Sequence, residues 1–170
     1  ALNKAKQSDL LAAQIAPLIQ NSKTSFDLVS GYFVPGEKGS ELIETIARRK
    51  VKTRVVTNGY AVTDVPIVHA GYISDRPQLV EAGVQLYEAR PLRGDKNASH
   101  KLGQTKFSGG GESVHAKTFA IDGKHMFIGS FNFDPRSALL NCEMGFIIES
   151  PQLAAAFTQA LDSRVMDHAY

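Results

Sequence analysis

Residues 114–132, VHAKTFAIDGKHMFIGSFN, form two strand-like runs joined by Asp122-Gly123. An Asp-Gly pair between two such runs is the strongest short-range signal for a β-hairpin with a two-residue type I′ turn. Such a turn places Ile121 opposite Lys124 and determines the pairing of every residue beyond them. The stretch therefore predicts an antiparallel hairpin with a defined register.

Four polar side chains gather at the open end of this hairpin. The predicted register places His115 directly opposite Ser130, and Lys117 and Asn132 share their face because side chains alternate with a period of two. A neutral imidazole can attack an electrophile or transfer a proton, and an ammonium and an amide can both donate to an anion. This combination suits chemistry on a phosphate, with Lys117 supplying the positive charge that a metal ion supplies in other enzymes.

The alternative is a structural hairpin, in which His115 and Lys117 are ordinary strand residues. Four polar groups converging on one face of an apolar hairpin nevertheless need partners or a ligand. This requirement favours a binding or catalytic site.

Outward from the hairpin, helical and strand-like patterns alternate along the chain. The elements predicted before it are a helix from the N-cap Ser8 to about Asn21, a strand at 26–33, a helix at 40–49, a strand at 51–57, a helix at 66–82 interrupted at Pro77, and a strand at 84–87. After the hairpin, a strand at 143–148 and a final helix starting at Ser150-Pro151 are predicted. The order predicts an α/β fold, an α-β-α layered sandwich in which helices flank a mixed sheet that begins with parallel strands.

Residues 90–113 carry no predicted element and contain several glycines. Between residues 90 and 106 they hold five basic side chains against Asp95 alone. A loop this long is usually functional or disordered, so we expect a flexible insertion in a single domain of residues 1–170. Its charge suits anionic lipid head groups or a polynucleotide, and the alternative is an ordinary solvated loop.

Composition limits the class of protein. With 170 residues, 43% hydrophobic and 21% charged, the chain is typical of one globular domain. A formal net charge of +2 is too small to indicate nucleic acid as a partner. Cys142 is the single cysteine, so no internal disulfide can form, and no run of apolar residues is long enough to span a membrane.

The hairpin resembles a known motif. His115-x-Lys117, Asp122 and Gly129-Ser130-x-Asn132 match the HKD motif of the phospholipase D superfamily at every defining position. Flanking stretches resemble the bacterial cardiolipin synthase branch: SGYFVPG (30–36), TNGYAVTD (57–64), HAGY (69–72), LVEAGVQLYE (79–88) and NFDPRSALLNCEMG (132–145). The likeness covers about residues 26–157.

The resemblance implies roles for individual residues. His115 would be the nucleophile that forms a phosphohistidine, or the acid that protonates the leaving oxygen. Lys117 and Asn132 would hold phosphate oxygens with Ser130 nearby, Glu143 would orient the histidine, and Asp122 would be structural. No metal or organic cofactor is implied. Position along the chain, rather than the resemblance, also makes four residues candidates for binding the rest of the substrate: Tyr32, Phe33, His69 and Arg136. The alternatives are core packing for Tyr32 and Phe33, a scaffold role for His69 and an ion pair with Glu149 for Arg136.

The superfamily site needs two HKD motifs, each contributing a histidine, and this chain holds one. The other histidines lack a lysine two residues further on: His69, His100, His125 and His168. Either the chain is one half of a longer two-motif protein, or two copies assemble one site. The start at Ala1 and the synthase-like flanks favour the C-terminal half of a longer synthase.

Three functions follow from the resemblance. The first is phosphatidyl transfer of the cardiolipin synthase type, with phosphatidylglycerol-like substrates, at the inner membrane of a bacterium. The second is a phospholipase D-like phosphodiesterase or nuclease that acts as a homodimer. The third is a non-catalytic half-domain that completes a partner half. The low net charge speaks against nucleic acid.

Overall fold

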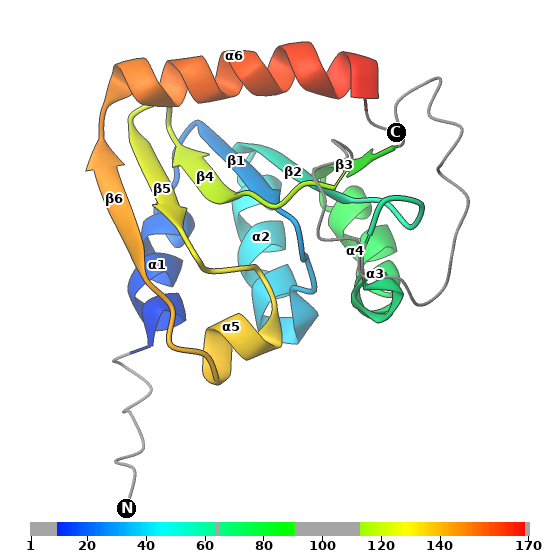
Figure 1. Cartoon of the computed structure of the whole chain (residues 1–170). Coiled ribbons are helices and arrows are strands. Elements are labelled where there is room, and N and C mark those ends of the chain that lie inside the picture. Colours follow the sequence, from blue (N-terminus) through cyan, green and yellow to red (C-terminus); the bar gives the residue numbers. More distant parts are fainter. Residues whose placement is uncertain (1–9, 64, 91–112, 169–170) are drawn as a thin grey trace, which may run out of the picture.

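A six-stranded mixed sheet forms the centre of the protein (Figure 1). The structure is a computed structural model and describes residues 10–63, 65–90 and 113–168, with side chains described up to residue 163. The strand order is β3-β2-β1-β4-β5-β6. β1, β2 and β3 are parallel, and each later strand is antiparallel to its neighbour. The strands are β1 (Ser25–Ser30), β2 (Lys52–Asn58), β3 (Gln85–Ala89), β4 (Lys117–Ile121), β5 (His125–Gly129) and β6 (Gly145–Glu149).

Helices cover both faces of this sheet, which confirms the predicted α-β-α sandwich. In Figure 1, α6 lies across one face, and α1 and α2 lie on the other. The main core forms between the sheet and α1, α2 and α4, around side chains such as Ile19, Ile43 and Leu79. The helices are α1 (Leu11–Gln20), α2 (Gly36–Arg48), α3 (Pro66–Ile73), α4 (Arg76–Glu81), α5 (Pro135–Leu139) and α6 (Pro151–His168).

The central strand β1 is buried on both faces. Phe26 and Leu28 pack in the main core, while Val29 on the opposite face packs with Leu161 of α6. A strand covered on both faces is apolar without a clean alternation, which is the pattern that SFDLVS shows.

A buried ion pair connects the sheet to α6. The Arg54 guanidinium donates to both carboxylate oxygens of Asp27, at 2.6 and 2.9 Å, and a further nitrogen of Arg54 donates to Asp162 of α6. Thr158 Oγ1 donates to the same Asp27 at 2.9 Å. The hydrogen bond that Arg54 donates to Asp27 raises the pKa of Arg54 above its ordinary value, against the opposing effect of burial. Asp27 is 1% exposed, so its charge depends on these donors.

Several element boundaries differ from the predicted ones. The break near Pro77 occurs before it, because Pro77 occupies the first turn of α4, where a missing N–H costs nothing. α2 begins at Gly36 rather than Ser40, with Pro35 at its N-cap. The short helix α5 was not predicted. Ser8 and most of the 90–113 loop lie outside the described residues.

The predicted hairpin register is wrong by one residue. Asp122 and Gly123 have φ values of 54° and 60°, and Lys124 N donates to Ile121 O at 3.0 Å, as a type I′ turn requires. However, Ile121 pairs with His125, not with Lys124. The Lys124 carbonyl accepts from Ser150 N at 2.9 Å instead of joining the hairpin ladder. Lys124 is therefore the extra residue of a β-bulge, which the sequence pattern did not reveal.

Candidate active site

Four of the polar motif residues lie at one edge of the sheet, namely His115, Lys117, Ser130 and Asn132. Ser30 at the end of β1 pairs with Lys117 at the start of β4, and Gly129 at the end of β5 pairs with Gly145 at the start of β6. β2 also ends at this edge, with Asn58. The carboxyl ends of parallel strands are the usual location of sites in α/β folds.

The bulge changes how the motif residues meet. With the observed register Ser130 is no longer directly opposite His115. Both residues lie beyond the strand ends, because β4 begins at Lys117 and β5 ends at Gly129. These motif residues therefore share this edge because several strands begin or end there, not because one hairpin face aligns them.

Asn58 holds the segment that carries His115. Its Nδ2 donates to Val114 O at 2.9 Å and to Gly31 O at 3.0 Å, and its Oδ1 accepts from Val114 N at 2.7 Å. Asn58 is buried, so these bonds satisfy its amide completely. The residue before His115 is thus attached to the ends of β1 and β2.

Ser30 holds the segment that follows Asn132. Its hydroxyl donates to Tyr32 O at 2.5 Å and accepts from Phe133 N at 3.1 Å. Val34 N also donates to Phe133 O at 2.8 Å. Buried polar groups from β1 and β2 therefore position both halves of the motif.

Ser130 and Glu143 form a second contact at this edge. The Ser130 hydroxyl donates to Glu143 Oε2, and Asn141 Nδ2 donates to Glu143 Oε1 at 3.1 Å. Burial opposes ionisation of Glu143, but the hydrogen bonds from Ser130 and Asn141 and the field of Lys117 outweigh it, so the pKa of this carboxyl lies below its ordinary value. Glu143 therefore stays ionised beside the motif.

The predicted hydrogen bond between Glu143 and His115 is not formed between these two described side chains. The Glu143 carboxylate is turned toward Ser130 instead. The His115 side chain is exposed. Lys117 is half-buried, and its ammonium donates to His115 O at 2.9 Å.

Asn132 carries a buried polar atom that lacks a partner. No hydrogen bond reaches its Oδ1 from any residue that the structure describes. An amide that turns by 180° presents its NH2 at the same position, so this group can accept from or donate to a ligand. Native proteins rarely leave such a group unpaired, and a functional role is one of the usual reasons.

The tentative substrate-binding residues have different surroundings. Phe33 is in the core, where its ring packs against Tyr72 and Phe133. His69 is also buried, with Nε2 3.4 Å from Glu88 Oε2. Tyr32 is half-buried and Arg136 is exposed on α5. Neither Phe33 nor His69 borders open solvent, so contact of these two with a substrate remains a prediction.

Asp122 lies at the opposite edge of the sheet. Its carboxylate accepts from the backbone N–H groups of Lys23, Thr24 and Ser25, at distances from 2.7 to 3.1 Å. Burial opposes ionisation of Asp122, but these hydrogen bonds outweigh it and lower its pKa. This motif residue ties the hairpin turn to the chain before β1.

Asn58 and Ser30 were not predicted as site residues. A signal existed, because each is a polar residue at the carboxyl end of a strand that is otherwise buried. Within the part of the chain that the structure describes, no three His, Cys, Asp or Glu side chains gather as metal ligands. Among the same residues, no helix is both long and apolar enough to cross a membrane.

Comparison with known proteins identifies relatives of this fold and sequence. A sequence model of the family described as "Cardiolipin synthase, PLD-like domain" matches residues 15–165. Cardiolipin synthase C of Escherichia coli is 46% identical over 167 residues, which cover 98% of this chain and 34% of that protein. The chain therefore spans about a third of the length of this curated relative.

Two solved structures share the fold. Nuc of Salmonella typhimurium, a phospholipase D family member, superimposes with a TM-score of 0.70 at 18% identity, covering 93% of this chain and 89% of Nuc. Phosphatidylserine synthase of Haemophilus influenzae superimposes with a TM-score of 0.65 at 14% identity, covering 92% of this chain but 35% of that chain. The same fold thus occurs both as nearly a whole chain and as part of a longer one.

Proposed function

Since the chain belongs to the family of cardiolipin synthase, PLD-like domains, we propose that it supplies one half-site of a phosphatidyltransferase. The observation that carries this proposal is the Asn132 amide, whose buried Oδ1 is unpaired among the described residues, at the same edge as an exposed imidazole and a lysine ammonium. Together these groups suit the binding and transfer of a phosphate diester.

In the proposed reaction, an imidazole nitrogen attacks the phosphorus of a phosphatidyl donor. A P–N bond forms as the P–O bond to the donor's alcohol breaks, and the histidine of the other half gives the leaving oxygen a proton. The hydroxyl of an acceptor lipid then attacks the same phosphorus, so a new P–O bond forms as the P–N bond to the histidine breaks, and the hydroxyl proton passes to that second histidine. His115 takes one of these two roles, and Lys117 and Asn132 hold the phosphate oxygens without a metal ion.

Glu143 has a positioning role in this proposal. Its carboxylate holds Ser130 and lies in the field of Lys117, so it keeps the phosphate-binding groups in place. The same negative charge offsets part of the Lys117 charge before substrate binds. Lys117 therefore already interacts with a negative charge before an anionic phosphate binds.

Exposed apolar side chains beside the site support a second half. β6 is the outermost described strand of its sheet, and Phe146 on it is 63% exposed. Met144, which follows Glu143, is 68% exposed, and Leu140 on the same connection is 77% exposed. The outermost strands of soluble proteins are normally protected by charges or short length, so the apolar side chains on and beside β6 favour a partner there. We propose that a second phospholipase D-like half covers it, from the same polypeptide or from a second copy.

The decisive experiment uses the full-length polypeptide that contains this chain. It is incubated with phosphatidylglycerol vesicles, and lipid products are identified by mass spectrometry. His115→Asn should abolish transfer, whereas His125→Asn, a histidine at the opposite edge of the sheet, should preserve it. Full activity of His115→Asn would remove the mechanism.

The same experiment separates the alternatives. Cleavage of DNA by a dimer of the isolated chain, without phosphatidyl transfer, would favour the phosphodiesterase reading that the near-complete overlap with Nuc suggests. A full-length protein that tolerates His115→Asn but needs this domain to fold would favour a non-catalytic half.

For the transferase we propose a peripheral position at the bacterial inner membrane.

A further inference from the structure

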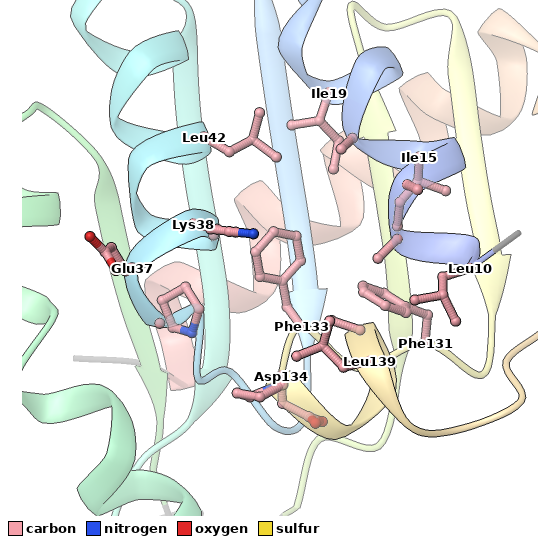
Figure 2. A pocket seen from close by; sticks show the side chains of 18 residues that line it. Leu10, Ile15, Ile19, Glu37, Lys38, Leu42, Phe131, Phe133, Asp134 and Leu139 are labelled. Carbon is pink, nitrogen blue, oxygen red and sulfur yellow. The ribbon is translucent and has the colours of Figure 1, made fainter. Parts of the chain in front are cut away.

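A separate apolar cavity of about 390 Å³ lies between α1, α2 and α5 (Figure 2). Its volume falls in the range of small-molecule sites, which are mostly apolar with a few placed polar groups. The apolar side chains that line it include Ile15, Ile19, Leu42, Phe131, Phe133 and Leu139. Figure 2 shows these side chains converging from the three helices and from the segment before α5.

The cavity shares one chain segment with the candidate active site but is distinct from it. Phe131 and Phe133 line the cavity, whereas Asn132 between them does not. Ser30 fixes this segment through Phe133 N. Gly39 of α2 permits the close approach, because a Cβ there would lie 3.1 Å from the Phe133 ring. The cavity is therefore built into the fold rather than left by a loose loop.

One charged group is directed over the cavity. In Figure 2, the Lys38 side chain extends from α2 toward the Phe133 ring, and the Glu37 carboxylate points away. The Asp134 carboxylate, also at the rim, accepts from the N–H groups of Arg136 and Ser137 at the start of α5. A cation at the mouth of an apolar cavity complements an amphiphile with an anionic head.

We propose that this cavity holds an acyl chain of an anionic phospholipid, with Lys38 at the head group. The choice of a phospholipid rests on the proposed function, because the substrate of that reaction is a phospholipid with an anionic head group. The shared chemistry, an apolar chain with an anionic head, also describes a free fatty acid. The experiment therefore distinguishes the two sources.

The test is photolabelling of the full-length polypeptide. One arm uses phosphatidylcholine vesicles that contain phosphatidylglycerol with a diazirine in one acyl chain, and the second uses a free fatty acid with the same diazirine chain. A third arm carries the diazirine on phosphatidylcholine, which has no net charge. Labelled peptides are mapped by mass spectrometry.

We expect phosphatidylglycerol to label α1, α2 and the segment from Phe131 to α5 more than phosphatidylcholine does. Ala16→Trp, which fills the cavity from α1, should lower this labelling about tenfold. The matched control Ala156→Trp, on an exposed position of α6, should leave it unchanged. Lys38→Gln should lower labelling about fivefold, whereas Lys23→Gln should not. Lys38 is exposed, so its replacement tests the proposal even where Ala16→Trp impairs folding.

Absence of label in these peptides in both charged arms would overturn the proposal, as would unchanged labelling of a folded Ala16→Trp protein. Equal labelling by phosphatidylcholine would also overturn it, because Lys38 would then have no role. Label that enters only after deletion of residues 1–9 would also overturn it, because that segment would then be the occupant of the cavity. Label from the fatty acid alone would support the cavity chemistry and reject the phospholipid source. Because labelling needs no turnover, an inactive His115→Asn protein should still be labelled, which separates this proposal from the proposed function.

Discussion

The Asn58 side chain pairs with Val114 as a second backbone would, accepting from Val114 N at 2.7 Å and donating to Val114 O at 2.9 Å. This amide, at the end of β2, holds the residue that precedes His115. We predict that Asn58→Leu lowers the free energy of unfolding by about 1–3 kcal/mol, because it leaves buried backbone groups unpaired. It should also lower kcat more than about tenfold through displacement of His115. Urea unfolding and lipid transfer measure the two effects.

The control for this variant is Asn21→Leu, an exposed asparagine at the end of α1. Both substitutions replace an amide with an isobutyl group, but Asn21 is far from the candidate site. If Asn58→Leu shows the predicted loss of stability but an unchanged kcat, the hydrogen bonds between Asn58 and Val114 do not position the histidine.

Ser130 and Glu143 should act as one unit. Ser130→Ala and Glu143→Gln are each expected to reduce kcat, and the double variant should lose little more than the worse single variant. Since the hydrogen bonds from Ser130 and Asn141 hold the pKa of Glu143 below its ordinary value, its charge persists as pH falls through the ordinary range of a glutamate and is lost only below that range. Transfer assays on the unmodified protein, the two single variants and the double variant test this coupling, and additive losses of kcat would contradict it.

Asp122 should stabilise the fold in a pH-dependent way. Its pKa is lowered in the folded state, so its contribution is complete above the unfolded-state value near 4 and disappears as pH falls through the lower folded value. Asp122→Ala should cost about 1–2 kcal/mol at neutral pH and little in strong acid. Urea unfolding from neutral to acidic pH measures this difference. A comparable effect of Asp75→Ala, whose side chain does not cap α4, would count against the explanation.

The buried ion pair should show a compensating double variant. Arg54→Met leaves the Asp27 charge buried and is predicted to cost about 3–5 kcal/mol. Adding Asp27→Leu should recover much of that loss, because no unpaired charge then remains. Asp162→Asn should cost less than about 1 kcal/mol, since Asp162 is largely exposed. Chemical denaturation of the three variants measures their free energies of unfolding, and a double variant less stable than Arg54→Met would refute the prediction.

The apolar edge at β6 should be needed for assembly and not for folding. Phe146→Asp is expected to change the stability of the isolated chain by less than about 0.5 kcal/mol, because Phe146 is exposed there. It should prevent association of the chain with a separately produced second half, measured by light scattering. Ile67→Asp on α3, where the side chain is 78% exposed, is the matched control. Equal association of both variants would place the interface elsewhere.

Much of the fold could be predicted because local patterns and packing agreed. Apolar runs separated by glycine and proline indicated the strands, and Asp122-Gly123 indicated a tight turn with positive φ at both residues. Helix α5 could not be predicted because five residues are too short to show a periodic pattern, and because its N-cap, Asp134, lies in a loop. The predicted start of α2 at residue 40 is too late because the pair Pro35-Gly36 has the composition of a turn, although proline is tolerated at a helix start.

The sequence by itself determined which residues can act on a phosphate, because His115, Lys117, Ser130 and Asn132 are chemically suited to it wherever they lie. It also determined the tight turn, because an Asp-Gly pair readily adopts positive φ. Tertiary structure decided how those residues meet. The hairpin pairs one residue out of the predicted register, with the Lys124 carbonyl accepting from Ser150 N instead of joining the ladder. Asn58 and Ser30 hold the motif segments from strands more than fifty residues away in sequence. Hydrogen bonds between distant segments have no local signature, so only the folded chain could reveal them.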